Sequence, residues 1–249
     1  MIARLPLALS LVLLVSAARP ATLTAAEGTA GKQVELTFKD AEGDVGYLLY
    51  LPADYDASAD VKWPLMLFLH GRGESRGPLS LVAKWGPPRF AQRGDSLPYI
   101  LVSPQCPNDG NWSDEVRQRQ LVRLLDAMLA SHRADADRVC LTGLSMGGSG
   151  TWTLAAAHPE RFAAIAPICG RSDASKASAL KDLPIWVFHG DQDPLDIKQP
   201  TETVEAIRKA GGGQVRFTTL EHVGHNSWSA AYATPELTTW MLKQKRAGR

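Results

Sequence analysis

The chain has 249 residues, of which 45% are hydrophobic and 21% charged, a composition that excludes a disordered or fibrous protein. Lysine and arginine total 27 against 26 aspartates and glutamates, so the formal net charge is +1. With so balanced a charge, we do not expect the chain to bind nucleic acid or an anionic membrane by electrostatic attraction.

The N-terminus has the order of regions typical of a secretory signal peptide. Arg4 supplies a positive charge, residues 5–15 are almost wholly apolar, and small residues follow. The apolar run is too short to span a bilayer comfortably. We therefore expect cleavage after Ala18 or Ala26, a secreted or periplasmic protein, and no stable membrane span after cleavage. An uncleaved N-terminal anchor is the alternative.

Apolar runs alternate with helix-length segments through residues 27–249, and no repeat or linker interrupts them, so we expect one domain over this range. Two strands joined by a turn, at 34–38 and 45–51, predict an antiparallel entry hairpin. Further strands are expected at 65–69, 99–102, 138–142, 162–168, 185–188 and 214–220. Helices are expected at 115–131, 146–158, 174–180, 201–209 and 235–245. This alternation predicts an α/β fold, with a mostly parallel central sheet and helices on both faces.

Residues 143–147 read Gly-Leu-Ser-Met-Gly and fit the pattern G-x-S-x-G. An expected strand precedes them and an expected helix follows, which is the strand–turn–helix setting of a nucleophile elbow. The serine of such an elbow lies on a strained turn, which requires small residues two positions before and two positions after it. Gly143 and Gly147 meet this requirement. We therefore expect Ser145 to be the nucleophile. A chance glycine-rich turn is the alternative.

A serine nucleophile needs a base, and the base needs an acid to orient it. In α/β folds that carry a nucleophile elbow, the three groups follow one another along the chain in the order serine, acid, histidine. The acid is expected after the strand at 185–188, where Asp193 is preferred over Asp191 and Asp196. The base is expected after the last strand, where His225 is preferred over His222.

An oxyanion hole needs two preorganised N–H donors. One is expected from the backbone of Met146, directly after the nucleophile. The other is expected from the Arg72 amide, in the glycine-containing loop 70–74 that follows the strand at 65–69. A plain glycine turn is the alternative for this loop. Acyl transfer by this set of groups requires no metal or organic cofactor.

The chain has three cysteines, Cys106, Cys140 and Cys169. In an exported protein they allow one disulfide with one thiol left over, and the sequence leaves the pairing open. No cysteine and histidine spacing typical of a metal site is present, so no metal site is expected.

Seven segments give the chain its resemblance to a known family. They are 63–74 (WPLMLFLHGRGE), 103–107 (SPQCP), 111–114 (NWSD), 143–152 (GLSMGGSGTW), 166–170 (APICG), 186–195 (WVFHGDQDPL) and 224–228 (GHNSW). The chain resembles the polyhydroxybutyrate-depolymerase-like and "predicted peptidase" esterases of the α/β-hydrolase superfamily. These are related to feruloyl and acetyl-xylan esterases and to the prolyl oligopeptidase catalytic domain. The resemblance implies Ser145, Asp193 and His225 as the triad and Arg72 and Met146 as oxyanion donors.

Tryptophans are expected near the carboxyl edge of the sheet, where they offer flat surface for sugars or aromatic groups. Trp112 and Trp228 are the candidate substrate contacts, with packing as the alternative role. The sequence thus predicts a secreted serine esterase acting on carbohydrate-linked or aromatic acyl esters. A serine peptidase or amidase of the prolyl-oligopeptidase type and a non-catalytic binding protein are the alternatives, and the oligomeric state is left open.

Overall fold

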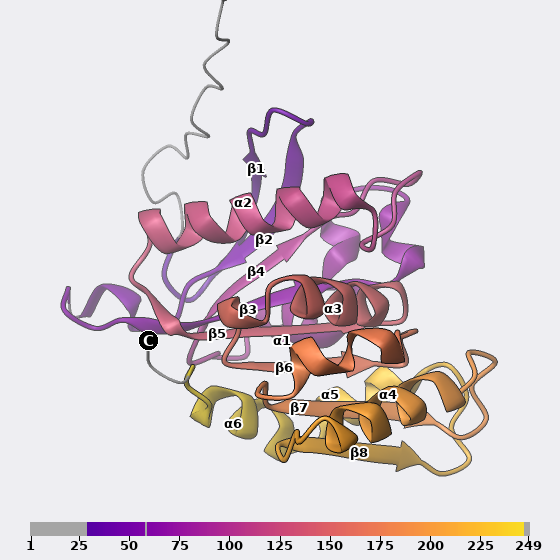
Figure 1. Ribbon diagram of the computed structural model, residues 1–249. Coiled ribbons are helices and arrows are strands. Elements are labelled where there is room, and N and C mark those ends of the chain that lie inside the picture. Colours follow the sequence, from indigo (N-terminus) through magenta and orange to yellow (C-terminus); the bar gives the residue numbers. More distant parts are fainter. Residues whose placement is uncertain (1–28, 58, 247–249) are drawn as a thin grey trace, which may run out of the picture.

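The computed structural model describes residues 29–57 and 59–246, built around one eight-stranded sheet (Figure 1). The expected signal peptide lies outside the described residues. The strand order across the sheet is β1-β2-β4-β3-β5-β6-β7-β8. The strands are β1 (Gln33–Phe38), β2 (Val45–Tyr50), β3 (Trp63–Leu69), β4 (Ile100–Pro104), β5 (Ala134–Leu144), β6 (Ala164–Ile168), β7 (Ile185–Gly190) and β8 (Val215–Leu220).

The expected fold class is confirmed. β1 pairs antiparallel with β2, and β2 pairs antiparallel with β4. All pairings from β4 to β8 are parallel. The carboxyl ends of the parallel strands therefore meet at one edge, which is where ligands bind in sheets of this kind.

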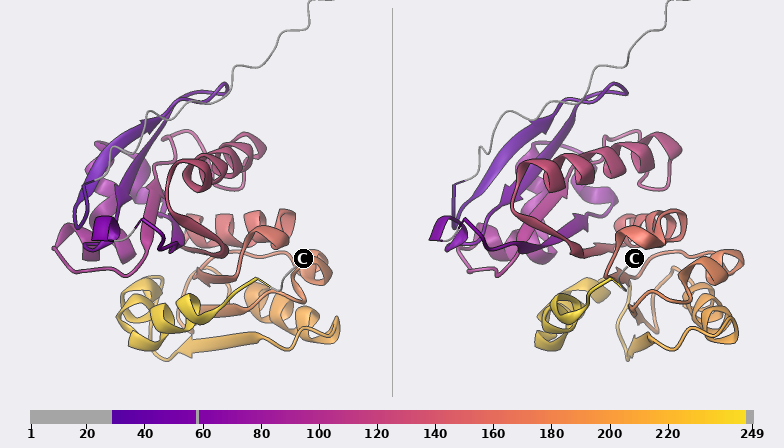
Figure 2. Two further views of the ribbon diagram at one scale, coloured as in Figure 1. Left: turned by 90° about the vertical axis from the view of Figure 1, so that its left-hand side faces the viewer. Right: turned by 60° about the vertical axis from the view of Figure 1, so that its left-hand side comes forward.

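Helices cover both faces of the sheet, because side chains along a buried strand alternate between two apolar layers. In β3, Leu65 and Leu67 pack into one layer and Met66 and Phe68 into the other. The first layer includes residues of α2 (Glu115–Ser131), α3 (Met146–Ala157) and α4 (Lys198–Lys209). The second includes residues of α1 (Gly86–Gln92), α5 (Ser227–Ala233) and α6 (Pro235–Lys243). Figure 2 shows the two helix layers with the sheet between them.

Several connections contain short 3-10 helices. These are η1 (Tyr55–Ala57), η2 (Arg72–Ser75), η3 (Leu79–Lys84), η4 (Pro159–Arg161) and η5 (Ala174–Leu180). The segment 174–180, expected as a short helix, is the 3-10 helix η5. Two helices, α1 and α5, were not expected from the sequence. The Gly-Pro-Pro that opens α1 reads as a chain breaker, although proline is tolerated in the first turn of a helix.

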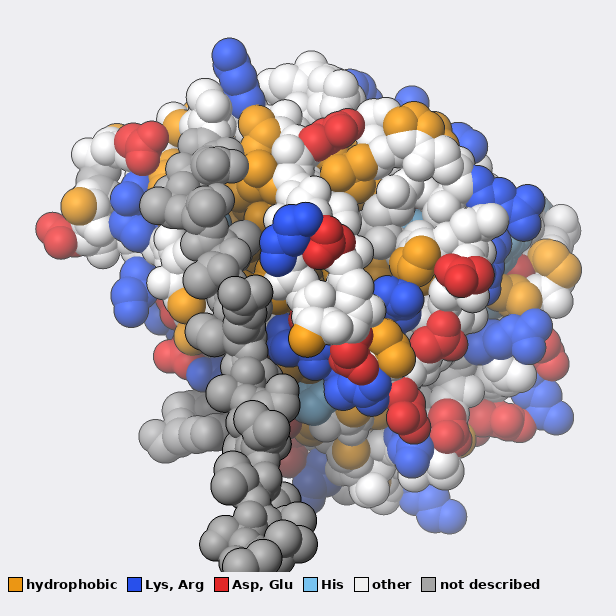
Figure 3. Space-filling view, turned by 90° about the horizontal axis from the view of Figure 1, so that it is seen from above, with side chains coloured by type: hydrophobic (Ala, Val, Ile, Leu, Met, Phe, Trp, Pro, Cys, Tyr) orange, Lys and Arg blue, Asp and Glu red, His pale blue; other side chains and the backbone are white. Residues whose placement is uncertain are grey.

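Ion pairs fasten the entry hairpin to the helix above it. Arg123 on α2 contacts Asp40, whose side chain is almost fully buried, and Arg119 contacts Glu42. The face of the molecule that carries α2 shows cations and carboxylates interspersed (Figure 3). None of the helices in 29–57 and 59–246 combines the length and the apolar character that crossing a bilayer requires.

Candidate active site

Ser145 lies at the turn between β5 and α3, with φ of 54° and ψ of −114°. A non-glycine residue in the left-handed region costs on the order of 1–3 kcal/mol and persists only where its surroundings impose it. One such constraint is the hydrogen bond from the Ser145 backbone N–H to the Ile168 carbonyl, 2.9 Å long. The turn therefore holds Ser145 at the carboxyl edge of the sheet, as a nucleophile elbow would.

Glycines permit this turn because neighbouring backbone comes too close for a side chain. A Cβ atom on Gly147 would overlap the carbonyl oxygen of Leu69, and one on Gly143 would overlap the carbonyl of Gly147. Gly148 is equally confined, against the Ile168 carbonyl. The G-x-S-x-G pattern here reflects packing of α3 directly onto β3 and β5.

The structure brings Ser145, His225 and Asp193 into one hydrogen-bonded chain. Ser145 Oγ lies 2.8 Å from His225 Nε2, and His225 Nδ1 lies 2.9 Å from each carboxylate oxygen of Asp193. The bond to the carboxylate requires a hydrogen on Nδ1, which leaves the Nε2 lone pair to accept the serine proton. This is the geometry of a nucleophile, a base and an orienting acid.

The loop after β7 holds the acid rigidly. The Asp193 side chain is fully buried, and its Oδ1 accepts the backbone N–H of Leu195 at 2.7 Å. His189 Nε2 donates to the Leu195 carbonyl at 2.8 Å and lies 3.5 Å from Asp193 Oδ2. The alternatives do not face the histidine: Asp191 is exposed, and Asp196 accepts the backbone N–H of Lys198. The contact between His189 and the acid was not predicted from the sequence.

Aromatic rings flank the histidine. Trp228, at the start of α5, stands edge-on to His225 with ring centroids 5.4 Å apart. Trp85 packs beside Trp228 at 5.9 Å. Both tryptophans are only half-buried, so ring surface remains available next to the reaction centre. This position is consistent with the expected contact between Trp228 and the substrate.

The two expected oxyanion donors occupy equivalent places in their elements. Arg72 is the first residue of η2, and Met146 is the first residue of α3. The N–H groups of a first helical turn have no partner within the helix, so both amides can serve a ligand. The Arg72 side chain points to the Gly110 carbonyl, to which its Nη1 donates a hydrogen bond of 2.6 Å.

His70 supports the loop that carries Arg72. It is buried, its Nε2 accepts the Cys106 backbone N–H at 2.9 Å, and its Nδ1 donates to the Gly71 carbonyl at 2.6 Å. Burial lowers the pKa of His70 to about 4, so the ring is neutral near pH 7. This supporting role of His70 was not predicted from the sequence. The histidine directly after a buried strand and before a glycine was the available signal.

The expectation that Trp112 contacts substrate is corrected. Trp112 is 2% exposed, and its Nε1 donates to the His70 carbonyl at 2.9 Å. Its Cβ and Cγ also lie where a side chain on Gly150 of α3 would have to be. Trp112 therefore joins the loop 70–74 to α3 and presents no surface to a ligand.

All three cysteines are free and buried, so the disulfide that the count allowed does not form. Cys169 lies beside the acid and the histidine. One ligand atom each from Cys169, Asp193 and His225 lie within 4.8 Å of one another, the closest approach to a metal site in 29–57 and 59–246. The same Asp193 and His225 atoms are engaged in hydrogen bonding, and burial raises the pKa of the Cys169 thiol to about 12.

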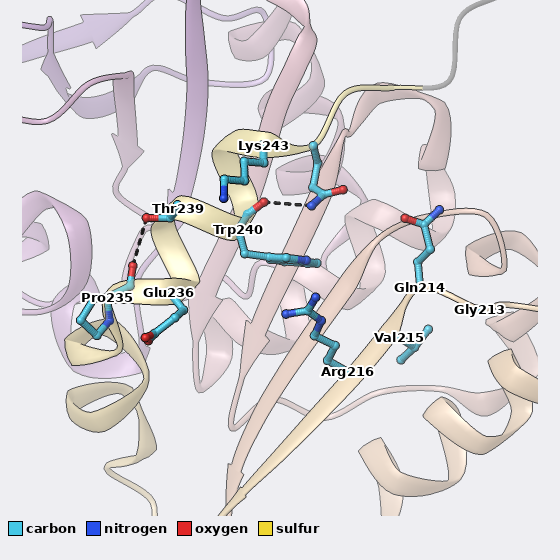
Figure 4. A pocket seen from close by; sticks show the side chains of 10 residues that line it. Gly213, Gln214, Val215, Arg216, Pro235, Glu236, Thr239, Trp240 and Lys243 are labelled. Atoms are coloured by element: carbon cyan, nitrogen blue, oxygen red, sulfur yellow. Dashed lines mark hydrogen bonds between the residues drawn. The ribbon is translucent and has the colours of Figure 1, made fainter.

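A hollow of about 730 Å³ lies away from these groups, between the start of β8 and α6 (Figure 4). Arg216, which lines it, packs over the rings of Trp186 and Trp240 at 5.1 and 5.6 Å. This hollow is at the amino end of a parallel strand, opposite the edge that carries Ser145.

Residues 39–240 match the model of the family described as "Putative esterase". The chain belongs to the Esterase family of α/β-hydrolases. This confirms the family expected from the sequence motifs and makes the chain an esterase-family hydrolase.

Individual relatives are also esterases or depolymerases by name. Poly(3-hydroxyalkanoate) depolymerase C of Paucimonas lemoignei is 28% identical, over 51% of this chain and 32% of its own length. Acetylxylan esterase A of Emericella nidulans is 26% identical, over 63% of this chain and 52% of its own length. A crystal structure of a thermostable esterase superposes with a TM-score of 0.74 at 34% identity, covering 86% of this chain and 64% of that one. The chain thus spans about half or less of these two curated relatives.

Proposed function

We propose that this chain is an exported serine esterase that cleaves carboxylic esters through Ser145, His225 and Asp193. The observation that carries the proposal is the continuous hydrogen-bonded chain from Ser145 Oγ through the His225 ring to Asp193. A strained turn holds the serine, and a fully buried carboxylate holds the histidine. A binding protein would have no need of this combination.

In the first half of the proposed reaction, Ser145 Oγ attacks the ester carbonyl carbon while its proton moves to His225 Nε2. The carbonyl electron pair moves onto the oxygen, where the amides of Arg72 and Met146 stabilise the negative charge. Asp193 stabilises the imidazolium that forms. As the tetrahedral intermediate collapses, Nε2–H gives its proton to the leaving alcohol and an acyl-serine remains.

In the second half, a water molecule takes the place of the alcohol. His225 Nε2 accepts a proton from this water as its oxygen attacks the acyl carbon, and the same two amides stabilise the second oxyanion. Collapse returns the proton to Ser145 Oγ and releases a carboxylic acid. Apart from the ester and the water, these steps use only side chains and backbone groups of this chain.

We propose carbohydrate-linked or aromatic acyl esters as the substrates. The half-buried rings of Trp228 and Trp85 beside His225 support this, because flat aromatic surface suits sugar rings and aromatic acids. The names of the relatives point the same way, since acetylxylan esterase A is named for a carbohydrate ester. Loss of activity toward such esters, relative to p-nitrophenyl acetate, in Trp228→Ala would support the assignment.

Export and cleavage of a signal peptide after Ala18 or Ala26 belong to the same proposal and rest on the sequence of the first 26 residues. N-terminal sequencing of the mature protein, expressed with its own leader, tests them. A mature chain that begins at Met1 would contradict both cleavage sites.

Covalent labelling separates an enzyme from a binding protein. A fluorophosphonate should label the wild-type chain and fail to label Ser145→Ala, because only an activated serine reacts with it. A panel of acetyl, feruloyl and peptide-anilide substrates then separates an esterase from a peptidase. Hydrolysis of anilides at rates equal to those of esters would overturn the esterase assignment, and absence of labelling would overturn the serine mechanism.

A further inference from the structure

A second concave surface, which we call the α3 groove, adjoins the candidate catalytic groups. Its volume is about 470 Å³, within the range of small-molecule sites. It runs along the side of α3 between the loop that precedes α2 and the segment that follows β6. Its lining includes Asn111, Ser113, Ser149, Trp152, Arg171 and Lys176.

The α3 groove combines apolar and hydroxyl-bearing surface. Trp152 and Leu180, both almost fully buried, lie beneath it. The hydroxyl groups of Ser113 and Thr153, which both line the groove, form a hydrogen bond of 3.1 Å with each other. Apolar surface with a few hydroxyl groups suits a ring that carries polar substituents.

Two contacts connect the groove to the candidate reaction centre. Ser149 Oγ donates a hydrogen bond of 3.3 Å to the backbone carbonyl of Ser145. Ser149 therefore lies one turn of α3, or about 5.4 Å along the helix, from the nucleophile. Asn111, which lines the groove, follows Gly110, and the Gly110 carbonyl accepts a hydrogen bond from the Arg72 side chain. The Ser149 end of the groove therefore lies one helical turn from Ser145.

The backbone that carries Arg171 is fixed. The Arg171 N–H donates to Ser149 Oγ at 2.8 Å. Gly170, just before it, packs so closely on Gly148 that a side chain there would overlap the α3 backbone. Fixed backbone preorganises the site, so little ordering is required when a ligand binds.

Two cations, Arg171 and Lys176, and one acid, Asp173, line the groove. Asp173 caps η5 by accepting the Ser175 N–H at 2.9 Å, and its charge interacts with that of Lys176. The Arg171 side chain is exposed, and within the described part of the chain it forms no ion pair. A guanidinium in this state matches the two oxygens of a carboxylate.

We propose that the α3 groove binds a carboxylate-bearing ring of the ester substrate, with Arg171 pairing the carboxylate. This rests on the proposed esterase function and narrows its substrates to anionic esters, such as those of uronic-acid sugars or carboxylated aromatic groups. The carboxylate belongs either to the acyl part or to the alcohol part, and matched probes distinguish the two.

The test compares anionic esters with neutral esters of equal size. The alcohol-side pair is the mono-O-acetyl esters of methyl glucuronoside and methyl glucoside. The acyl-side pair is the 4-nitrophenyl esters of terephthalic acid, one with its second carboxyl free and one with it methylated. For each pair, the ratio of kcat/KM for the anionic over the neutral ester is measured in wild type, Arg171→Ala, Arg171→Lys and Arg171→Glu.

We expect a ratio above about tenfold in wild type for one of the two pairs, equivalent to ~1.4 kcal/mol. Arg171→Ala should bring it close to one, Arg171→Lys should keep part of it, and Arg171→Glu should favour the neutral ester. Higher salt should reduce the wild-type ratio, because partly exposed charges are screened. Lys62→Ala, which removes an exposed cation just before β3 at the opposite edge of the sheet, should leave the ratio unchanged.

The outcomes separate this inference from the function on which it rests. Equal rates on both members of both pairs in wild type, or a ratio that survives Arg171→Glu, would overturn the anionic-substrate proposal while ester hydrolysis stands. Absence of both fluorophosphonate labelling and hydrolysis of any ester would overturn the proposed function itself.

Discussion

Trp112 Nε1 donates a 2.9 Å hydrogen bond to the carbonyl of His70, joining the loop before α2 to the loop that carries the candidate oxyanion donor. The same His70 accepts the Cys106 N–H through its ring. The position of the Arg72 amide thus depends on a tryptophan and a histidine that would touch no substrate.

Trp112→Phe should therefore lower kcat more than it raises KM. Phenylalanine keeps most of the ring volume but leaves the buried His70 carbonyl without its donor, which costs roughly 1–3 kcal/mol. We expect the free energy of unfolding to fall by about that amount and kcat to fall about tenfold. Steady-state kinetics and urea unfolding measure the two effects.

Trp63→Phe is the matched control for this change, because Trp63 Nε1 is buried without a partner at the start of β3. It should leave kcat unchanged. Equal kcat for wild type and Trp112→Phe would contradict a role for Trp112 in placing the oxyanion loop.

Gly147→Ala should abolish activity and destabilise the fold. In an ordinary helix interior this change stabilises by up to about 1 kcal/mol, because glycine loses more backbone entropy than alanine. Here the added Cβ would overlap the Leu69 carbonyl, and backbone of β3 would have to move. Gly213→Ala is the control, since no atom lies within 4 Å of its added Cβ. Thermal unfolding and p-nitrophenyl acetate hydrolysis distinguish the two variants.

Asp193→Asn should reduce kcat by roughly 10⁴-fold with little change in stability. An amide in place of the carboxylate no longer favours the Nδ1–H tautomer of His225, so Nε2 loses the lone pair that accepts the serine proton. Asp191→Asn, two residues earlier and exposed, should retain full activity. If the two variants lost activity equally, Asp193 would not be the orienting acid.

The free energy of unfolding should decline between pH 6.5 and pH 4 in part because of His70. Burial lowers its pKa in the folded state to about 4, below the 6.5 of an exposed histidine. As the pH falls below 6.5, the unfolded chain binds a proton that the folded chain does not. The contribution, fully present above pH 6.5, is lost towards pH 4 and amounts to roughly 3 kcal/mol.

His70→Gln isolates this contribution. The variant should be less stable than wild type at pH 7, because it loses the ring's contacts, but its stability should depend less steeply on pH. Urea unfolding at pH 7, 5.5 and 4.5 gives both slopes. Parallel slopes for wild type and variant would show that His70 is protonated equally in both states.

Much of the fold follows from local pattern. Helix α2 has the predicted bounds, 115–131, because its apolar residues repeat with helical period over a long segment. Strand β5 begins at Ala134, four residues before its prediction, since the polar residues at its start hide a strand that pairs with β3. Helix α5 has no strong local pattern of its own, and its buried residues pack on sheet residues that are distant in sequence.

The candidate nucleophile, acid and base were predicted from the sequence, because an elbow needs glycines at fixed spacing and the fold sets the chain order of the other two groups. Their hydrogen bonds belong to tertiary structure alone, since 80 residues separate Ser145 from His225. The same holds for the burial of Trp112 and for the unpaired charge of Arg171. Local pattern reports the period of an element, whereas the direction and partners of a side chain depend on elements packed against it from elsewhere in the chain.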